Sequence, residues 1–138
     1  MTIERIETLA KEPRAVYLAL EALNGLRLRG CLEECCCGAN WHSHALLAVE
    51  DGESIGLIIY QTVDWKNKLD LEIGYVRPDR RRAGVYRALW DELIGVAREK
   101  GIPVISGATH VDNQEMQAVM SRLDRQLKWL TYEYRLTP

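Results

Sequence analysis

The sequence contains no apolar run that approaches the roughly 20 residues needed by a membrane-spanning helix. It also has no excess of positive charge. Its formal net charge is -2 at pH 7, whereas duplex binding usually needs a strongly basic domain or face. Residues 1–14 (MTIERIETLAKEPR) alternate charged and apolar side chains, so they lack the continuous apolar segment of a signal peptide. We therefore expect a cytoplasmic protein that binds neither nucleic acid nor membranes.

Cysteine is absent outside one short stretch, residues 31–44 (CLEECCCGANWHSH). Disulfides are not expected in a cytosolic chain, but cysteine and histidine are also zinc ligands. The stretch lacks the two C-x-x-C pairs typical of structural zinc sites, so we expect no metal and interpret the cysteines as small buried hydrophobes. A small metal-binding regulatory domain is the alternative. Its ligands would come from Cys31, Cys35, Cys37, His42 and His44.

The remaining composition is that of a globular domain with a real core, since 47% of the 138 residues are hydrophobic and 28% are charged. We expect a single domain over residues 1–138. Apolar residues at helical spacing predict a first helix over residues 3–10. A second helix is predicted over residues 15–28, opened by Pro13, with Val16, Leu20 and Leu23 along its buried face.

The hydrophobic period then changes to that of strands. Residues 45–63 predict two strands joined at Asp51-Gly52, a strong hairpin signal. Residues 69–76 (LDLEIGYV) alternate, which places Leu69, Leu71, Ile73 and Tyr75 on one face. The opposite face carries Asp70, Glu72, Gly74 and Val76.

The second half alternates helices and strands. We predict a long helix over residues 83–100 capped by Gly101, a buried strand in residues 103–110, a helix over 113–127 and a last strand over 128–136. The strands on either side of the long helix form a crossover and should be parallel. The predicted fold class is α/β (α+β), with a mixed, mostly antiparallel sheet and helices on both faces.

The stretch RPDRRRAGVYRALW, residues 77–90, joins an arginine-rich turn to the start of the long helix. The first amides of a helix have no partner within it, and the helix dipole favours an anion there. Gly84 permits close approach of a ligand, and arginine suits phosphate. These features indicate a phosphate or pyrophosphate site, whereas the competing interpretation is a plain solvated turn.

This order of elements resembles the GNAT superfamily of N-acetyltransferases over roughly residues 45–136. The three defined positions of the family motif R/Q-x-x-G-x-G/A are occupied by Arg81, Gly84 and Tyr86, and YVRP before it and RALW after it resemble the flanking strand and helix. Asn113 matches an asparagine that often begins the next helix. The ending YEYRL resembles that of many short members, including bacteriophage-encoded ones.

The resemblance implies a splayed parallel strand pair with acetyl-CoA in the gap, as co-substrate. The amides of residues 82–87 would hold its pyrophosphate, and Val76 and its neighbours would pair with the pantetheine arm. The implied cofactor-binding residues are Tyr75, Val76, Arg81, Arg82, Ala83, Gly84, Val85, Tyr86, Arg87 and Asn113.

The sequence also departs from the family pattern. Tyr86 stands where the family has glycine or alanine, and its ring would crowd the phosphates unless it turns away. Met120 replaces a tyrosine that often reprotonates the CoA thiolate, which methionine cannot do. Met116 replaces an alanine, and Asp124-Arg125 replaces Gly-Phe.

Three residues are candidates for proton transfer. Asp70 and Glu72 share one face of the strand that leads to the implied cofactor site, and Asp70 falls near the position of a base used by some family members. His110 follows the next strand, and a histidine side chain can serve as a base or an acid at neutral pH. The competing interpretation is a solvated strand face for the two carboxylates and a capping or surface role for His110.

We therefore expect an N-acetyltransferase that moves an acetyl group directly from acetyl-CoA to a primary amine, on a small-molecule or peptide acceptor. The alternative is a catalytically inactive GNAT-like domain that binds CoA or a protein. An exposed edge at residues 128–136 favours a homodimer.

Overall fold

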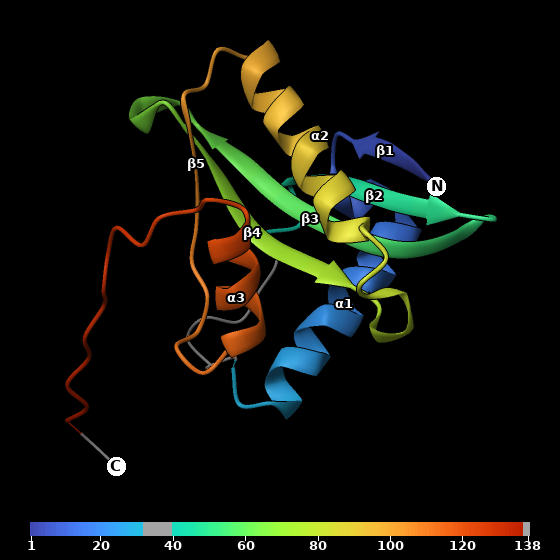
Figure 1. The fold of residues 1–138 in the computed structure, drawn as a ribbon. Coiled ribbons are helices and arrows are strands. Elements are labelled where there is room, and N and C mark those ends of the chain that lie inside the picture. Colours follow the sequence, from blue (N-terminus) through green and yellow to red (C-terminus); the bar gives the residue numbers. More distant parts are fainter. Residues whose placement is uncertain (32–39, 137–138) are drawn as a thin grey trace.

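The computed structural model describes residues 1–31 and 40–136, which form one five-stranded sheet in the order β1-β2-β3-β4-β5 with helices packed on both faces (Figure 1). Strands β1 to β4 are antiparallel neighbours, and β5 lies parallel to β4. The predicted mixed sheet is confirmed. The strands are β1 (Thr2–Ile6), β2 (His44–Glu50), β3 (Glu53–Val63), β4 (Lys68–Val76) and β5 (Val104–Gly107), and the helices are α1 (Pro13–Leu28), α2 (Val85–Glu99) and α3 (Gln114–Arg122).

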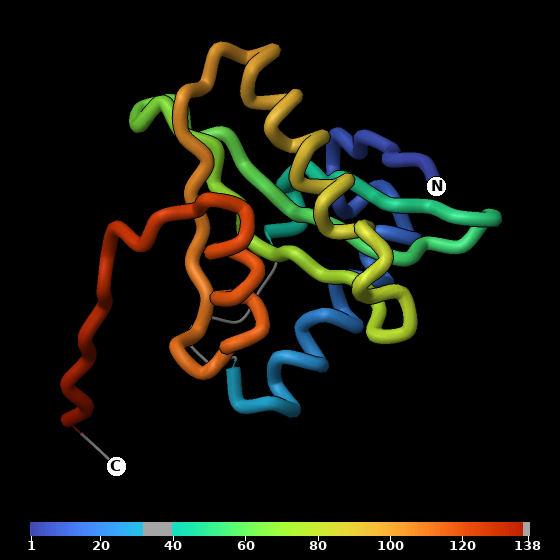
Figure 2. Tube along the Cα trace, in the orientation of Figure 1, coloured from blue at the N-terminus to red at the C-terminus, as the bar shows by residue number. Residues whose placement is uncertain are grey.

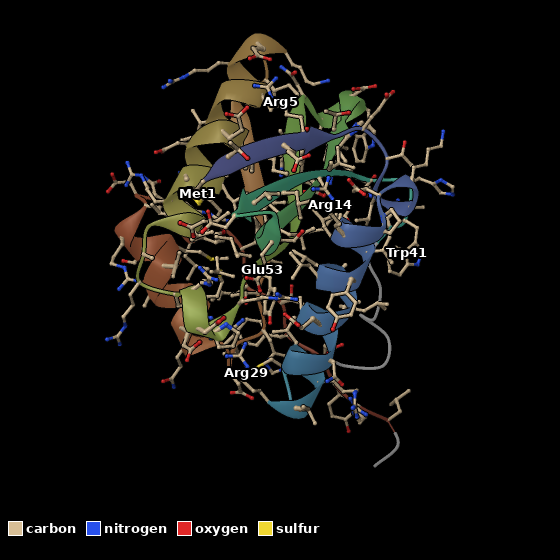
Figure 3. The ribbon with its side chains drawn as sticks, turned by 90° about the vertical axis from the view of Figure 1, so that its right-hand side faces the viewer. Met1, Arg5, Arg14, Arg29, Trp41 and Glu53 are labelled. Carbon is tan, nitrogen blue, oxygen red and sulfur yellow. The ribbon has the colours of Figure 1, made fainter. Side chains whose placement is uncertain are left out.

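The helix predicted over residues 3–10 is wrong, because residues 2–6 form β1 and only Leu9–Lys11 make a 3-10 turn. Pairing with β2 gives this segment a full ladder of backbone hydrogen bonds, and such tertiary pairing overrides a short helical pattern. Ion pairs fix the strand in place. Arg5 bonds Glu92 of α2 at 2.6 Å, and Glu4 bonds Arg14 of α1 at 2.9 Å (Figure 3).

Helix α1 begins at Pro13 as predicted, but it buries a different face. Its buried side chains are Ala15, Leu18, Ala19 and Ala22, whereas Leu20, expected in the core, is 53% exposed. Alanines let the helix approach the sheet closely, so the small residues face inward. They pack against Leu57, Ile59 and other side chains of one sheet face.

A β-bulge at Glu72 divides β4 into two halves. Ile59 of β3 pairs with Ile73 and Tyr60 pairs with Leu71, so Glu72 is an extra residue in the ladder. Leu69 and Leu71 therefore pack with α2, whereas Ile73 packs on the α1 side. The predicted unbroken alternation over residues 69–76 is wrong, because the extra residue reverses the faces of the residues after it.

Helix α2 was predicted closely, and its stripe, which includes Leu89 and Leu93, is fully buried against the sheet. The helix ends at Glu99, and Gly101 follows it with a φ of +66° and a hydrogen bond from its amide to the Arg98 carbonyl, which fits a glycine cap. The next strand, β5, is parallel to β4 as expected. It is not fully buried, however, because it is the last strand of the sheet and Val104 is 46% exposed.

The predicted last helix is shorter, and the predicted last strand is absent from the described residues. Helix α3 stops at Arg122, and Asp124 takes a left-handed φ of +57° that ends the helical path. Residues 127–136 run away from the body of the molecule as an extended segment without strand pairing (Figures 1 and 2). We call these residues the tail. Across the described ranges no helix has the length and hydropathy of a membrane span.

The bulge yields a stability prediction. Deleting Glu72 should leave Ile73 and Tyr75 in the α1-facing core, because Leu71 and Ile73 then become neighbours that alternate between the two faces, and the loss is limited to the hydrogen bonds of Glu72, roughly 1–3 kcal/mol. Urea unfolding measures the loss. The Glu72→Gln variant keeps the extra residue and should unfold within about 1 kcal/mol of the parent. A deletion that abolishes folding, as expected if Ile73 and Tyr75 left the core, would contradict the assignment of Glu72 as the extra residue.

Candidate active site

The parallel pair β4–β5 opens at the bulge. Its ladder joins Lys68–Leu71 to Val104–Gly107 and then stops, because β5 has ended. Residues 72–76 of β4 continue beyond this point, and within the described ranges no strand pairs with their β5-facing edge. We call residues 72–76 the open segment. Free backbone groups at the carboxyl ends of parallel strands are a common place for ligands in α/β sheets.

A tight turn carries the chain from the open segment into α2. Two residues of this turn take left-handed conformations, Arg82 with φ +62° and Gly84 with φ +79°, and α2 starts directly afterwards. A Cβ added to Gly84 would meet nothing within 4 Å. The amides of residues 82–87 donate to no acceptor in residues 1–31 and 40–136. Such a cluster of free amides at a helix start suits an anion, and we call it the anion turn.

Two of the arginines in this region anchor the turn. Arg77 lies 3.3 Å from Glu21 of α1 and 2.9 Å from Glu53 at the start of β3. Arg80 lies 3.1 Å from Glu53 and 3.4 Å from Glu50. These side chains point to acidic groups of the protein, so their charge holds the turn against the hairpin and α1.

The next two arginines differ in their partners. Arg81 donates from Nε to the Val76 carbonyl at 2.9 Å, and its Nη1 lies 3.5 Å from the Glu115 carboxylate in the first turn of α3. Arg82 is exposed and makes no ion pair with any residue that the structure describes. Arg82 is thus the arginine of the turn whose charge is left for a ligand.

The other predicted cofactor residues differ in burial and in the partners they contact. Ala83 is exposed beside Gly84, whereas Val85 is buried in the core. Arg87 pairs with Asp91 one turn along α2, at 3.1 Å. Asn113 is buried, and its Oδ1 accepts from an amide in the first turn of α3 at 3.3 Å. Val85 and Asn113 therefore have structural roles, in packing and in capping.

The Tyr86 ring turns away from the anion turn and packs against the sheet. An added Cβ on Gly74, in the open segment, would lie 2.7 Å from Cε2 of Tyr86, so the ring occupies the space that glycine leaves. The hydroxyl accepts from Nη1 of Arg125 at 3.4 Å, and burial raises the pKa of Tyr86. The side chain that replaces the small residue of the family motif therefore does not crowd the turn, but it stands beside the open segment.

The two predicted carboxylates point to the same sheet face, the one that α1 covers. Asp70 is exposed and accepts from Oγ of Ser106 at 2.9 Å. Glu72 is half-buried at the bulge and accepts from Oγ of Ser43 at 2.8 Å and from Nε2 of Gln61. Sequence reasoning missed Ser43 and Gln61. Both are polar residues at the ends of apolar strand segments, but no local pattern shows that they meet Glu72.

The third candidate, His110, lies in the connection between β5 and α3. Its Nδ1 accepts from the Asp112 amide at 3.1 Å and lies 3.7 Å from the Asp112 carboxylate. Its carbonyl accepts from the amide of Asn113 at 2.9 Å. These contacts serve the turn that begins α3, which is the capping role of the competing interpretation.

Part of the cysteine stretch lies within the described residues. Cys35, Cys36 and Cys37 lie outside the described residues, and Cys31 is buried after α1. His44, the first residue of β2, forms a hydrogen bond between its Nδ1 and the Glu7 carbonyl at 2.6 Å. In the part of the chain with described positions, no three histidine, cysteine or carboxylate side chains are grouped to hold a metal ion.

Comparison with known proteins gives one family. The model of the acetyltransferase (GNAT) family matches residues 4–124. A thialysine N-epsilon-acetyltransferase of Caenorhabditis elegans is 31% identical over 84 residues, which are 60% of this chain and 52% of that protein. The chain thus matches about half the length of that curated relative.

Solved structures show the same fold. The ribosomal-protein-alanine N-acetyltransferase of Brucella melitensis biovar Abortus 2308 superposes with a TM-score of 0.71 at 17% identity, covering 99% of this chain and 100% of that one. The aminoglycoside N-acetyltransferase AAC(6')-Iy, solved in complex with CoA, superposes with a TM-score of 0.65 at 22% identity, again covering 99% and 100%.

Tyr75, one of the predicted cofactor residues, gives a pH prediction. Burial raises its pKa from 10.0 to about 12, helped by its hydrogen bond to Glu21 at 2.8 Å. The folded protein keeps this proton while the unfolded chain loses it near its ordinary pKa. The stability that Tyr75 contributes is therefore full below that pKa and is lost as pH rises toward about 12.

Absorbance titration of tyrosinate measures this shift, with Tyr75→Phe identifying the contribution of Tyr75 among the six tyrosines. Glu21→Gln should lower the pKa of Tyr75, because the repelling charge is removed. The unfolding free energy of Tyr75→Phe should fall less steeply than that of the parent above pH 10.0. A Tyr75 that titrates at its ordinary pKa would contradict the contact with Glu21.

Proposed function

Because this chain belongs to the acetyltransferase (GNAT) family, we propose that it moves an acetyl group from acetyl-CoA directly to a primary amine. The observation that carries the proposal is the anion turn, where the free amides of residues 82–87 and the uncompensated charge of Arg82 meet at the start of α2. Pyrophosphate fits this donor set, because it offers several acceptor oxygens and negative charge.

The open segment supports the same assignment. It leaves backbone donors and acceptors of residues 72–76 without a strand partner, directly beside the turn that would hold the pyrophosphate. An extended chain that carries amide groups, such as the pantetheine arm of CoA, can bond to a strand edge as another strand would. Neighbours solved with CoA or with acetyl coenzyme A share the fold.

Acetyl transfer needs a neutral amine, and Glu72 is the carboxylate we assign as its base. In the reaction the amine nitrogen bonds the acetyl carbon and the amine proton goes to the base, while the carbon–sulfur bond breaks with its electron pair on sulfur, so that CoA leaves as the thiolate. Glu72 stands where β4 leaves β5, as the first residue of the open segment, whereas Asp70 lies within the paired part of the strand. Ser43 and Gln61 hold its carboxylate in place.

The acceptor is proposed only as a class. The related proteins include N-acetyltransferases named for thialysine, for ribosomal-protein alanine and for aminoglycosides, all of which offer an amine. We infer a small-molecule or peptide amine for this chain. A screen of primary amines that follows CoA release is the direct assay.

One observation favours the alternative, a domain that binds CoA without transferring the acetyl group. The ring of Tyr86 stands on Gly74 in the open segment, with Arg125 against its hydroxyl. Met120 brings no hydroxyl that could protonate a thiolate. Acetyl-CoA binding without turnover across the amine screen would support this alternative.

The anion turn gives the binding prediction. Acetyl-CoA at ~100 times its dissociation constant should add about 2.7 kcal/mol to the unfolding free energy, which thermal unfolding registers as a higher melting temperature. Gly84→Asp should abolish the rise, because a carboxylate then faces the pyrophosphate.

Gly84→Ala is the matched control for backbone strain. Its Cβ meets nothing within 4 Å, and it carries the same positive-φ cost of about 1–2 kcal/mol without the charge. We expect it to keep most of the rise. A rise of equal size in Gly84→Asp would place the ligand elsewhere, and no rise in the parent would contradict the proposed function.

The base assignment has its own test. Glu72→Gln should lower kcat by ~100-fold or more and remove the acidic limb of the pH profile of kcat, while the rise in melting temperature with acetyl-CoA remains. Asp70→Asn is the matched control, an amide substitution two residues earlier on the same face, and we expect it to retain most of the activity. A large loss in Asp70→Asn alone would move the base to Asp70.

A further inference from the structure

The side chains of Tyr86 and Arg125 meet beside the point where β4 leaves β5. We call this point the fork, and it is defined by Leu71 and Gly107, the last pair of the parallel ladder. A Cβ added to Gly107 would lie 3.0 Å from Nη2 of Arg125, and one added to Gly74 would lie 3.0 Å from the hydroxyl oxygen of Tyr86. Two glycines, one on each strand, thus leave room for a phenol and a guanidinium at the fork.

Packing and hydrogen bonds hold both side chains in place. The Tyr86 ring is partly buried against the core under α2, and its hydroxyl accepts from Nη1 of Arg125 at 3.4 Å. The guanidinium of Arg125 lies 4.7 Å from the centre of the Trp90 ring, whose face attracts a cation. The Arg125 amide donates to the Met120 carbonyl at 3.0 Å. The pair is therefore a fixed part of the fold.

The hydroxyl of Tyr86 keeps its own proton available. It accepts from Arg125, and within residues 1–31 and 40–136 its proton is donated to no acceptor. In these same ranges Arg125, which follows α3, is the one charged group that acts on the hydroxyl, and no charge of β4 or α2 does so. Burial raises the pKa of Tyr86, so the phenol is protonated at neutral pH, and a phenolate formed there would face a cation.

The position of the ring leaves the edge of the open segment to a ligand. Side chains stand roughly perpendicular to a sheet, so the Tyr86 ring over Gly74 covers the face on the α2 side. The free backbone groups of residues 72–76 point toward β5, in the plane of the sheet. The carboxylate of Glu72 lies on the opposite face, with Ser43 and Gln61. A ligand at this edge thus has a carboxylate on one face and a phenol on the other.

We propose that Tyr86 is the acid that protonates the CoA thiolate when the carbon–sulfur bond breaks, and that Arg125 is its positioning residue. This inference rests on the proposed function, in which CoA leaves as the thiolate. The phenol gives its proton to sulfur, an S–H bond forms, and the remaining phenolate accepts from the Arg125 guanidinium. After CoA leaves, water returns a proton to the phenolate, and Glu72 releases to water the proton that it took from the amine.

Two other groups near the fork are poorer donors for this step. Glu72 takes up a proton in the same reaction and lies on the other face of the sheet. The hydroxyl of Ser106, the residue before Gly107, already donates to Asp70 at 2.9 Å. Tyr86 combines a free proton, a place beside the open segment and a cation that stabilises the resulting phenolate.

Bound CoA tests the contact without turnover. With CoA isotope-labelled at the carbon next to sulfur, NMR follows the titration of the thiol in the complex. A phenol that donates to the thiolate stabilises it, so Tyr86→Phe should lower the ratio of thiolate to thiol at a fixed pH at least ~10-fold, because a hydrogen bond to a charged group is lost. The ring still packs on Gly74, so the variant should fold and bind CoA.

Tyr60→Phe is the matched control. It removes the hydroxyl of another tyrosine buried in the same core, whose charged neighbours are Arg5, Glu92 and Glu99. This variant should leave the thiolate ratio of bound CoA unchanged. A ratio that changes equally in Tyr60→Phe and Tyr86→Phe would overturn the contact, because the effect would then come from the core as a whole.

Kinetics with the primary amine that the parent acetylates fastest separate an acid from a structural residue. Tyr86→Phe should lower kcat ~100-fold and leave the KM for acetyl-CoA within about 2-fold, because the hydroxyl acts on the leaving group. The kcat of the parent should fall at high pH as Tyr86 loses its proton, and Tyr86→Phe should lack this alkaline limb. Arg125→Lys, which keeps a cation, should retain more of kcat than Arg125→Gln.

The outcomes distinguish this inference from the proposed function. If the parent binds acetyl-CoA and acetylates the amine, while Tyr86→Phe keeps the parent's kcat and thiolate ratio, the acid alone is overturned. A raised KM with an unchanged alkaline limb in Tyr86→Phe would show that the ring only shapes the site, which also overturns the acid. A parent that shows no rise in melting temperature with acetyl-CoA, or that acetylates no amine, would contradict the proposed function and the acid with it.

Discussion

The extra residue in β4 is the constraint on which the rest of the molecule depends. If Glu72 were paired in a regular ladder, the side chains of β4 would alternate strictly, and the strand would present Leu71 and Ile73 to the same helix. With Glu72 as an extra residue outside the ladder, Leu71 belongs to the core under α2 and Ile73 to the core under α1. The same residue marks the point where β4 parts from β5, since their ladder ends at Leu71 and Gly107. One insertion thus sets the packing of two layers and the place where a ligand can reach the backbone.

The anion turn illustrates how charge can serve structure and binding in one motif. Arg77 and Arg80 are occupied by Glu21, Glu50 and Glu53, so their positive charge is largely cancelled within the protein. Their value lies in fixing a turn that contains two left-handed residues, a geometry that is costly for Arg82. Because the neighbours hold the turn, Arg82 and the amides after it stay available. The number of arginines in such a stretch therefore does not give the number of residues that bind phosphate.

Local patterns predicted the elements whose neighbours lie close along the chain. The hairpin at Asp51-Gly52, helix α2 with its cap at Gly101 and the parallel partner of β4 all follow from turn chemistry and periodicity. The misses share a physical cause, which is pairing with distant residues. Residues 2–6 form strand β1 because they pair with β2, and packing against the sheet determines which face of α1 is buried. The bulge is equally invisible to alternation, because LDLEIGYV fits an unbroken strand just as well.

The candidate site divides in the same way. The motif around Gly84 could be found from sequence, since the helix start and its positive-φ glycine are local properties. The support of Glu72 by Ser43 and Gln61 could not, because those residues come from two other segments of the chain. The direction of the Tyr86 ring could not be predicted from the motif either. It is decided by the absence of a side chain at Gly74, twelve positions earlier in sequence and adjacent only in the fold.

The contact between Arg81 and Glu115 joins the two helix starts that border the site. Glu115 lies 3.5 Å from Arg81 and 3.2 Å from Arg29, and its side chain is 71% exposed. Ion pairs this exposed contribute little, about 0–1 kcal/mol, because water screens them. An anion that reaches the turn and is held by several amides at once therefore competes with Glu115 on favourable terms. Arg81 can then replace the Glu115 carboxylate by the bound anion while its Nε still donates to the Val76 carbonyl. The end of β4 and the anion turn therefore stay joined when the anion binds.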